Sequence, residues 1–205
     1  MAERAGIWEQ GAEMASKSPR DPRQAARLLE PGPVVLVTAQ FRSQPNVMTA
    51  AWVMPLSLDP PRVGVAIHPS RFTHELVTRG ELFVLNLPTL DLLEAVHRCG
   101  IVSGRDVDKF VQAGLHPADA LEIDVPIIEE CVAHIECGLA ERLSLGDHDL
   151  FVGDVLAVSA DDELFTDRWQ IADDSPLIHH VALDLYAGLS RPYTARLERE
   201  EGEES

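Results

Sequence analysis

Residues 62–68 read RVGVAIH, and in this stretch the apolar Val63, Val65 and Ile67 alternate with small or polar residues. A period of two is typical of a strand that buries one of its faces. Similar strand signals occur on both sides of it, at residues 33–39, 82–87, 133–140 and 149–159. Helical segments interrupt these strands without regular alternation. We therefore expect a mainly β protein with peripheral helices (α+β), a barrel or sandwich rather than a doubly wound sheet.

Helix signals lie between the predicted strands. Ser70 and Thr73 are both good N-caps for a helix that we expect to end at Gly80 as its C-terminal glycine. A second helix is expected from Thr89 to Gly100, and a short one after Pro22.

The charge of the chain limits the partners that it can have. The 205 residues carry 17 Lys and Arg against 34 Asp and Glu, a formal net charge of −17, and residues 101–205 hold 7 basic and 24 acidic side chains. A free-standing nucleic-acid binder needs a basic face, so no nucleic-acid partner is expected. The excess acid is interpreted as a solubilising surface, with an acidic docking tail as the alternative.

The domain organisation predicted from composition is simple. Residues 1–20 are expected to form a mobile N-terminal arm, residues 21–196 a single domain, and residues 197–205 an acidic disordered tail. The first residues lack a signal-peptide core, and no apolar run approaches the ~18 residues of a membrane span. We expect a cytoplasmic protein with no membrane partner.

Cysteine spacing argues against a metal site. The chain has three cysteines and no C-x-x-C pair. Cys131 and Cys137 are expected on one face of a strand and His134 on the other, so we predict reduced thiols and no metal.

Several common nucleotide and hydrolase motifs are missing from the sequence, but three segments carry polar residues that a core does not need. Residues 45–52 place small residues beside Asn and Thr, which suits a flat ligand or a turn into a buried strand. Residues 68–74 combine hydroxyls and an arginine at a helix start, which suits an anion or simple capping. In residues 100–110, Arg105 and Lys109 suggest a phosphate or carboxylate ligand, or local pairing with nearby aspartates.

Together and in this order these segments resemble the flavin reductase-like family of FMN-binding split β-barrels, which includes flavoredoxin and the reductase components of two-component monooxygenases. The matching stretches are 46–52 (NVMTAAW), 57–61 (SLDPP), 71–74 (RFTH), 83–88 (FVLNLP), 103–110 (SGRDVDKF), and 146–148 (GDH) followed by 152–155 (VGDV).

The resemblance implies a homodimeric split β-barrel with FMN near the interface, FAD being the alternative flavin. It implies cofactor-binding roles for Asn46, Met48, Thr49, Ala50, Ala51, Trp52, Ser70, Arg71, Thr73, Asn86, Ser103, Arg105, Lys109 and Phe110. The Thr49 hydroxyl and nearby backbone would line the flavin ring, and Ser70, Arg71 and Thr73 would hold the phosphate. His148 would be the catalytic residue, positioning the nicotinamide or relaying a proton.

The function that follows is an FMN-dependent oxidoreductase in which NAD(P)H reduces the flavin, which passes electrons to free flavin, a partner oxygenase or another small acceptor. One alternative is an electron-transfer flavoprotein without direct NAD(P)H turnover. Another is a non-enzymatic flavin-binding module.

Overall fold

The computed structural model describes residues 18–171, 176–190 and 192–195. Its helical elements are η1 (Pro22–Gln24), α1 (Ala25–Leu29), α2 (Phe72–Gly80), η2 (Leu90–Leu92), α3 (Leu93–Ile101) and α4 (Lys109–Ala113). Its strands are β1 (Gly32–Pro33), β2 (Val35–Phe41), β3 (Gln44–Ala50), β4 (Val53–Leu58), β5 (Pro61–Ile67), β6 (Leu82–Leu87), β7 (Pro117–Ala118), β8 (Ile127–Ile128), β9 (Ala133–Leu145), β10 (His148–Ala160), β11 (Ile178–Ala182) and β12 (Leu185–Gly188).

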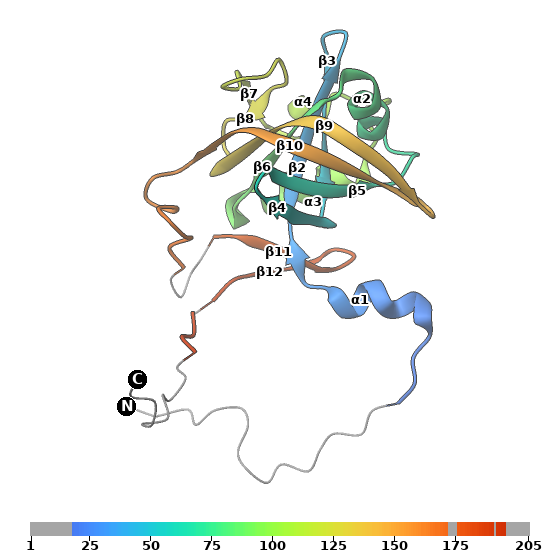
Figure 1. Cartoon of the computed structure of the whole chain (residues 1–205), viewed down its shortest axis with the longest axis vertical. Coiled ribbons are helices and arrows are strands. Elements are labelled where there is room, and N and C mark those ends of the chain that lie inside the picture. The colour runs from blue at the N-terminus through green and yellow to red at the C-terminus, as the bar shows by residue number, and fades with distance from the viewer. Residues whose placement is uncertain (1–17, 172–175, 191, 196–205) are drawn as a thin grey trace, which may run out of the picture.

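Seven antiparallel strands form the main sheet in the order β3-β2-β6-β9-β10-β5-β4, and the helices lie around it (Figure 1). The mainly β architecture with peripheral helices is confirmed. The long hairpin of β9 and β10 sits in the middle of the sheet, and its strands are bent by irregularities at Val152/Gly153 and Val155/Ala157. Such bulges increase the curvature that a barrel needs.

Strand β2 is buried on both of its faces, and its side chains contribute to two separate cores. Val35 and Val37 of β2 join Phe83 and Phe151 in a core inside the sheet. Leu36, which points the other way, joins Val96 of α3 in a second core between the sheet and the helices. The unbroken apolar run of residues 33–39 therefore marks a strand packed between two layers.

Helix α2 has the predicted position, but both of its ends differ: its N-cap residue is Arg71, and neither Ser70 nor Thr73 caps it. Gly80 is its last helical residue rather than the residue that follows the helix, and Glu81 adopts the left-handed conformation with φ 57°. A Cβ on residue 80 would lie 2.4 Å from the Gln40 carbonyl oxygen. The glycine is there because β2 passes close to the helix, a long-range cause that no local pattern shows.

Two further sequence predictions are corrected. Cys131 and Cys137 do not share a strand face: Cys131 precedes β9 and packs with the α3 side, whereas Cys137 lies in the core inside the sheet. Residues 46–50 belong to strand β3 itself and are not a turn before a strand.

A smaller sheet of order β1-β11-β12 lies below the barrel, and it brings the C-terminal segment against the start of the domain (Figure 1). The predictions for residues 1–17 and 197–205 lie outside the described residues. Among the described residues, no helix has the length and apolar character needed to cross a membrane.

Candidate functional site

A cleft of about 550 Å³ opens between the barrel and the small sheet. Its roof is the end of β3 with the link to β4 (Met48, Thr49, Ala50, Ala51, Trp52), together with Ala66, His68, Ser70, Arg71 and His148. Its other walls come from α3 (His97, Gly100, Ile101) and from Glu30, His180, Leu183 and Tyr186. The volume is within the range of small-molecule and cofactor sites.

A smaller hollow of about 80 Å³, which we call the anion pocket, adjoins this cleft. The two share Met48, Thr49, Ser70, Arg71 and Gly100, and the anion pocket adds Asn46, Phe72, Thr73, Cys99, Val102, Ser103, Gly104 and Lys109. No carboxylate is among the described residues that line the anion pocket, although the chain as a whole carries −17.

The anion pocket is built around the N terminus of α2. No side chain caps this end of the helix, so the backbone N–H groups of Phe72 and Thr73 are available to a ligand, whereas that of His74 donates to the Arg71 carbonyl (3.1 Å). The buried Asn46 amide donates to the Thr73 hydroxyl (2.8 Å), which leaves the hydroxyl hydrogen free to donate in turn. A Cβ on Gly104 would lie 1.8 Å from Asn46 Oδ1, so only glycine lets the 103–105 loop approach this strand.

Lys109 is the buried cation of the anion pocket. Its side chain is 6% exposed, and Nζ donates to the Cys99 carbonyl (2.7 Å). Burial lowers the pKa of Lys109 to about 8, with the Cys99 thiol acting in the opposite direction and Arg71 adding to the fall. An anion beside this ammonium would offset the desolvation that disfavours its charge.

Aromatic rings gather at one end of the cleft. The His148 ring lies 4.7 Å from that of Trp52 and 5.2 Å from that of His68. His148 Nδ1 is 2.9 Å from Asp147 Oδ1, and this hydrogen bond lowers the pKa of the Asp147 carboxyl. Leu145 and His148 pair directly across a two-residue turn, which fixes the ring at the start of β10.

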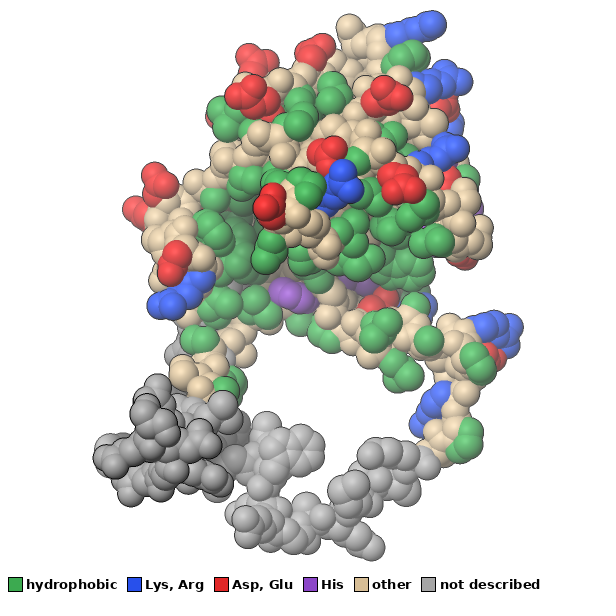
Figure 2. Space-filling view, viewed as in Figure 1, with side chains coloured by type: hydrophobic (Ala, Val, Ile, Leu, Met, Phe, Trp, Pro, Cys, Tyr) green, Lys and Arg blue, Asp and Glu red, His purple; other side chains and the backbone are tan. Residues whose placement is uncertain are grey.

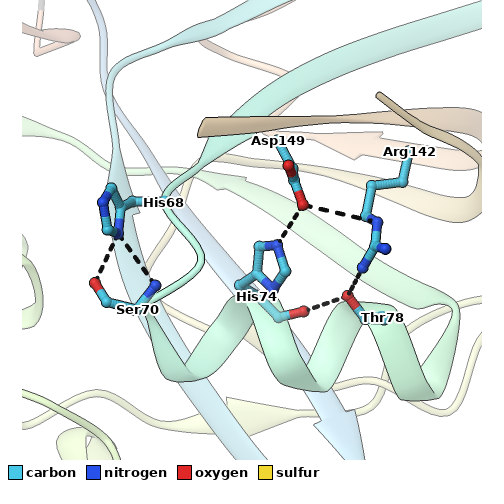
Figure 3. A network of polar contacts seen from close by, with 6 residues as sticks. All are labelled: His68, Ser70, His74, Thr78, Arg142 and Asp149. Atoms are coloured by element: carbon cyan, nitrogen blue, oxygen red, sulfur yellow. Dashed lines mark hydrogen bonds and ion pairs between the residues drawn. The ribbon is translucent and has the colours of Figure 1, made fainter. Parts of the chain in front are cut away.

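Helix α2 is fixed on its other side by a polar network (Figure 3). His74 Nε2 donates to Asp149 Oδ2 (2.8 Å), and Arg142 donates to the Thr78 hydroxyl (3.2 Å), which donates to the His74 carbonyl (2.7 Å). The hydrogen bond from His74 is the main cause that lowers the pKa of the Asp149 carboxyl. Asp149 follows His148 in β10, so the network ties the helix of the anion pocket to the strand of the aromatic end.

The structure brings most of the predicted site residues together. Those that line the cleft or the anion pocket are Asn46, Met48, Thr49, Ala50, Ala51, Trp52, Ser70, Arg71, Thr73, Ser103, Lys109 and His148. The Thr49 hydroxyl was expected to line the flavin ring, but its hydrogen is used elsewhere. It donates to the Val96 carbonyl and so joins β3 to α3.

Three predicted residues have other positions. Asn86 is fully buried: it donates to the Leu36 carbonyl (2.8 Å) and accepts from the Ile128 amide (2.9 Å), so its amide holds strands together. Phe110 is part of the core beside α3. Arg105 pairs with Glu75 (2.9 Å) outside the two hollows, and not with the neighbouring aspartates.

Sequence reasoning missed the residues that close the cleft from below, Glu30, His97, His180, Leu183 and Tyr186. They come from three distant segments and carry no common motif. His68 also lines the cleft and was not among the predicted site residues, although it lies at the end of a predicted strand.

The barrel thus carries a cleft and an adjoining pocket whose lining includes two cationic side chains, Arg71 and Lys109. Residues 27–181 match the model of the flavin reductase like domain, and the chain belongs to the flavin reductase-like family.

Individual relatives agree with this family assignment. The uncharacterised protein YddH of Escherichia coli is 33% identical, over 86% of this chain and 97% of its own. The FMN-binding protein from Thermus thermophilus is 31% identical, with a TM-score of 0.78 over 89% of this chain and all of its own. Flavoredoxin from Methanosarcina acetivorans is 25% identical, with a TM-score of 0.78 over 89% of this chain and 96% of its own. The expected split-barrel fold is therefore confirmed.

Proposed function

We propose that this chain binds FMN and acts as an NAD(P)H-dependent flavin reductase, passing electrons to free flavin or to a partner such as an oxygenase. The observation that carries the proposal is the continuity of the two hollows. The cleft suits a flat ring system, the anion pocket suits a phosphate, and five lining residues belong to both. FMN-binding relatives with the same fold support it.

The anion pocket fits a phosphate dianion by the chemistry of its donors. Arg71 and Lys109 provide positive charge, and Ser70, Thr73 and Ser103 provide hydroxyls. The uncapped N terminus of α2 adds backbone N–H groups and the positive end of the helix dipole. Arg105 acts indirectly in this proposal: it donates to the Ser70 carbonyl (3.2 Å) and so braces the loop that carries Ser70 and Arg71.

The cleft fits the ring of a flavin along the backbone of residues 48–52. Ala50 and Ala51 leave room for a flat ligand to approach the main chain, and Trp52 and His148 provide ring surfaces at one end. Bound FMN would supply the hydride and electron transfer, as flavins do. The chain would orient it, exclude water from one face, and place His148 where a second ring could stack.

We also propose a homodimer. Large apolar side chains are exposed on β4, β9 and β10: Met54, Leu56, Leu58, Leu143, Leu145, Leu156 and Val158. Figure 2 shows hydrophobic side chains gathered across the face where these strands lie. An exposed apolar surface of this kind is typical of an interface, and the cleft residue Trp52, 45% exposed, directly precedes β4. Light scattering coupled to size-exclusion chromatography tests the dimer.

The experiment that tests the function is a visible spectrum of the protein, first as purified, then with FMN or FAD, and then anaerobically with NADH or NADPH. We expect flavin bands that bleach when the pyridine nucleotide is added. A protein that binds no flavin contradicts the proposal. Bands that persist with both nucleotides favour the second candidate, an electron-transfer flavoprotein, which the similarity to flavoredoxin supports.

A further inference from the structure

The floor of the cleft holds a polar pair that the proposed function leaves unused. Glu30 directly follows α1, and His180 lies in β11. Glu30 Oε1 and His180 Nδ1 are 3.7 Å apart, and the two side chains are only 14% and 21% exposed. Glu30 Oε2 and His180 Nδ1 are buried, and neither has a hydrogen-bond partner among the described residues.

The hydrogen bond of the other ring nitrogen, His180 Nε2, shows whether Nδ1 is a donor or an acceptor in the neutral imidazole. His180 Nε2 is 3.2 Å from the Leu183 carbonyl oxygen. A carbonyl only accepts, so Nε2 carries a hydrogen, and in the neutral imidazole Nδ1 is then a bare acceptor. Glu30 Oε1 and His180 Nδ1, two acceptors 3.7 Å apart, therefore face each other with no donor between them. Buried polar groups in native structures are usually hydrogen-bonded, so this arrangement calls for an explanation.

A group with two hydrogens on one nitrogen satisfies both acceptors at once. A nitrogen about 2.9 Å from each could donate one hydrogen to Glu30 and the other to His180. A ketone, an ether or a carboxylate could not, because none of them donates. The neighbouring walls are rings and apolar side chains. The Tyr186 ring lies edge to face with the His180 ring, with 5.3 Å between ring centroids, and with the His97 ring, with 6.0 Å between centroids. Leu183 also lines this part of the cleft.

Figure 2 shows histidine side chains at the base of the barrel, above the segment that carries β11 and β12. Glu30 and His180 line the same cleft as residues 48–52, which we propose to line the flavin.

We infer that Glu30 and His180 form a subsite for a primary carboxamide on a planar ring, and that the nicotinamide of the proposed electron donor supplies this group. The inference rests on the proposed function for the source of the carboxamide, but the chemistry of the subsite comes from the pair itself. Glu30 and His180 are positioning residues here and take no part in the transfer of hydride.

The test compares two dinucleotides that differ only at this group. NAD⁺ carries the carboxamide, and its 3-acetylpyridine analogue carries a methyl ketone with no N–H. Both are titrated into FMN-loaded protein, with calorimetry or quenching of flavin fluorescence as the readout. We expect the parent protein to prefer NAD⁺ by about tenfold or more, because a site built to accept hydrogen bonds rejects an analogue that lacks the donor.

Glu30→Gln is the decisive variant. Glutamine keeps the shape of the side chain, and its own amide can donate to His180 Nδ1, which replaces the donor of the ligand. We expect the preference to fall to about one. Asp184→Asn is the matched control: it removes one negative charge from the turn between β11 and β12, outside the cleft, and should keep the preference of the parent. Because the ratio of two affinities is read, a general loss of folded protein cancels.

An unchanged preference in Glu30→Gln overturns the inference, and so does a parent protein with no preference. Glu30 and a protonated His180 would then be an internal ion pair. Failure of the proposed function is recognised separately, by the absence of bound flavin. If the loaded parent binds neither dinucleotide, the NAD(P)H donor is wrong, and free nicotinamide is compared with 3-acetylpyridine in its place. A lack of preference for the amide ring there also overturns the inference.

Discussion

Replacing Lys109 with methionine should change stability and flavin affinity in opposite directions. The pKa of Lys109 falls from 10.5 to about 8 because the ammonium is buried. Each pKa unit corresponds to 1.36 kcal/mol, so keeping this group charged in the flavin-free protein costs about 3 kcal/mol. The variant loses the hydrogen bond to the Cys99 carbonyl, which is a loss of about 1 kcal/mol. At pH 7 we expect Lys109→Met to stabilise the flavin-free protein by about 2 kcal/mol.

Flavin affinity should fall in the same variant. A hydrogen bond between an ammonium and a phosphate contributes about 1.5–3 kcal/mol, so the dissociation constant of FMN should rise by about 10- to 100-fold. Urea unfolding of the flavin-free protein measures the first effect, and fluorescence titration with FMN the second. Arg98→Met is the control, because it removes an exposed cation from α3 outside the anion pocket and should leave FMN affinity unchanged.

The pH dependence has a definite sign. Between pH 8 and 10.5 the unfolded chain holds the Lys109 proton that the folded chain has lost, so the penalty is complete below pH 8 and disappears as the pH rises to 10.5. FMN affinity of the parent should fall above pH 8, where the ammonium loses its proton, and that of the variant should stay flat. Equal FMN affinity in parent and variant, or a variant that is less stable at pH 7, would refute this account of Lys109.

Three further changes test the remaining assignments. Asn86→Ala should destabilise the fold by about 2–4 kcal/mol in urea unfolding, because buried backbone groups of β2 and β8 lose their partner. The folded fraction should bind FMN as the parent does, and a weaker affinity would return Asn86 to the site. Gly104→Ala should weaken FMN binding in a titration, since its Cβ would displace Asn46 from the anion pocket; unchanged affinity would mean that the loop is free to move. For His148→Ala we expect retained flavin and a slower single-turnover reduction by NAD(P)H in stopped-flow absorbance, and a rate equal to that of the parent would remove the role given to this ring.

The strands and helices could be predicted because their signals are local. Strand β6 has the bounds that its apolar run indicates, and the alternation in 62–68 is that of β5. Gly80 was misread because its cause is distant: the Gln40 carbonyl of β2 occupies the space that a side chain would need. Cys131 was misplaced because counting by twos assumes that the strand has already begun, whereas β9 begins at Ala133.

The site was predictable where residues near in sequence build it, and less so where the fold assembles it. The 68–74 segment supplies both the turn and the helix start of the anion pocket, so its chemistry is visible in one stretch. A polar residue in a strand gives no such guidance: Asn46 lines the anion pocket, whereas Asn86 binds backbone in the core. Glu30 and His180 are 150 positions apart and meet only because β1 pairs with β11.

The pairing of β10 on both of its sides limits how this protein can change in length. His148 and Asp149 are neighbours, so one side chain faces the cleft and the other faces α2. A one-residue slip of β10 against β9 and β5 would exchange these two directions, removing the ring from the cleft and the carboxylate from His74 together. Changes in length should therefore occur at the tip of the turn, Gly146 and Asp147, and not within β10, where a partner strand lies on each side.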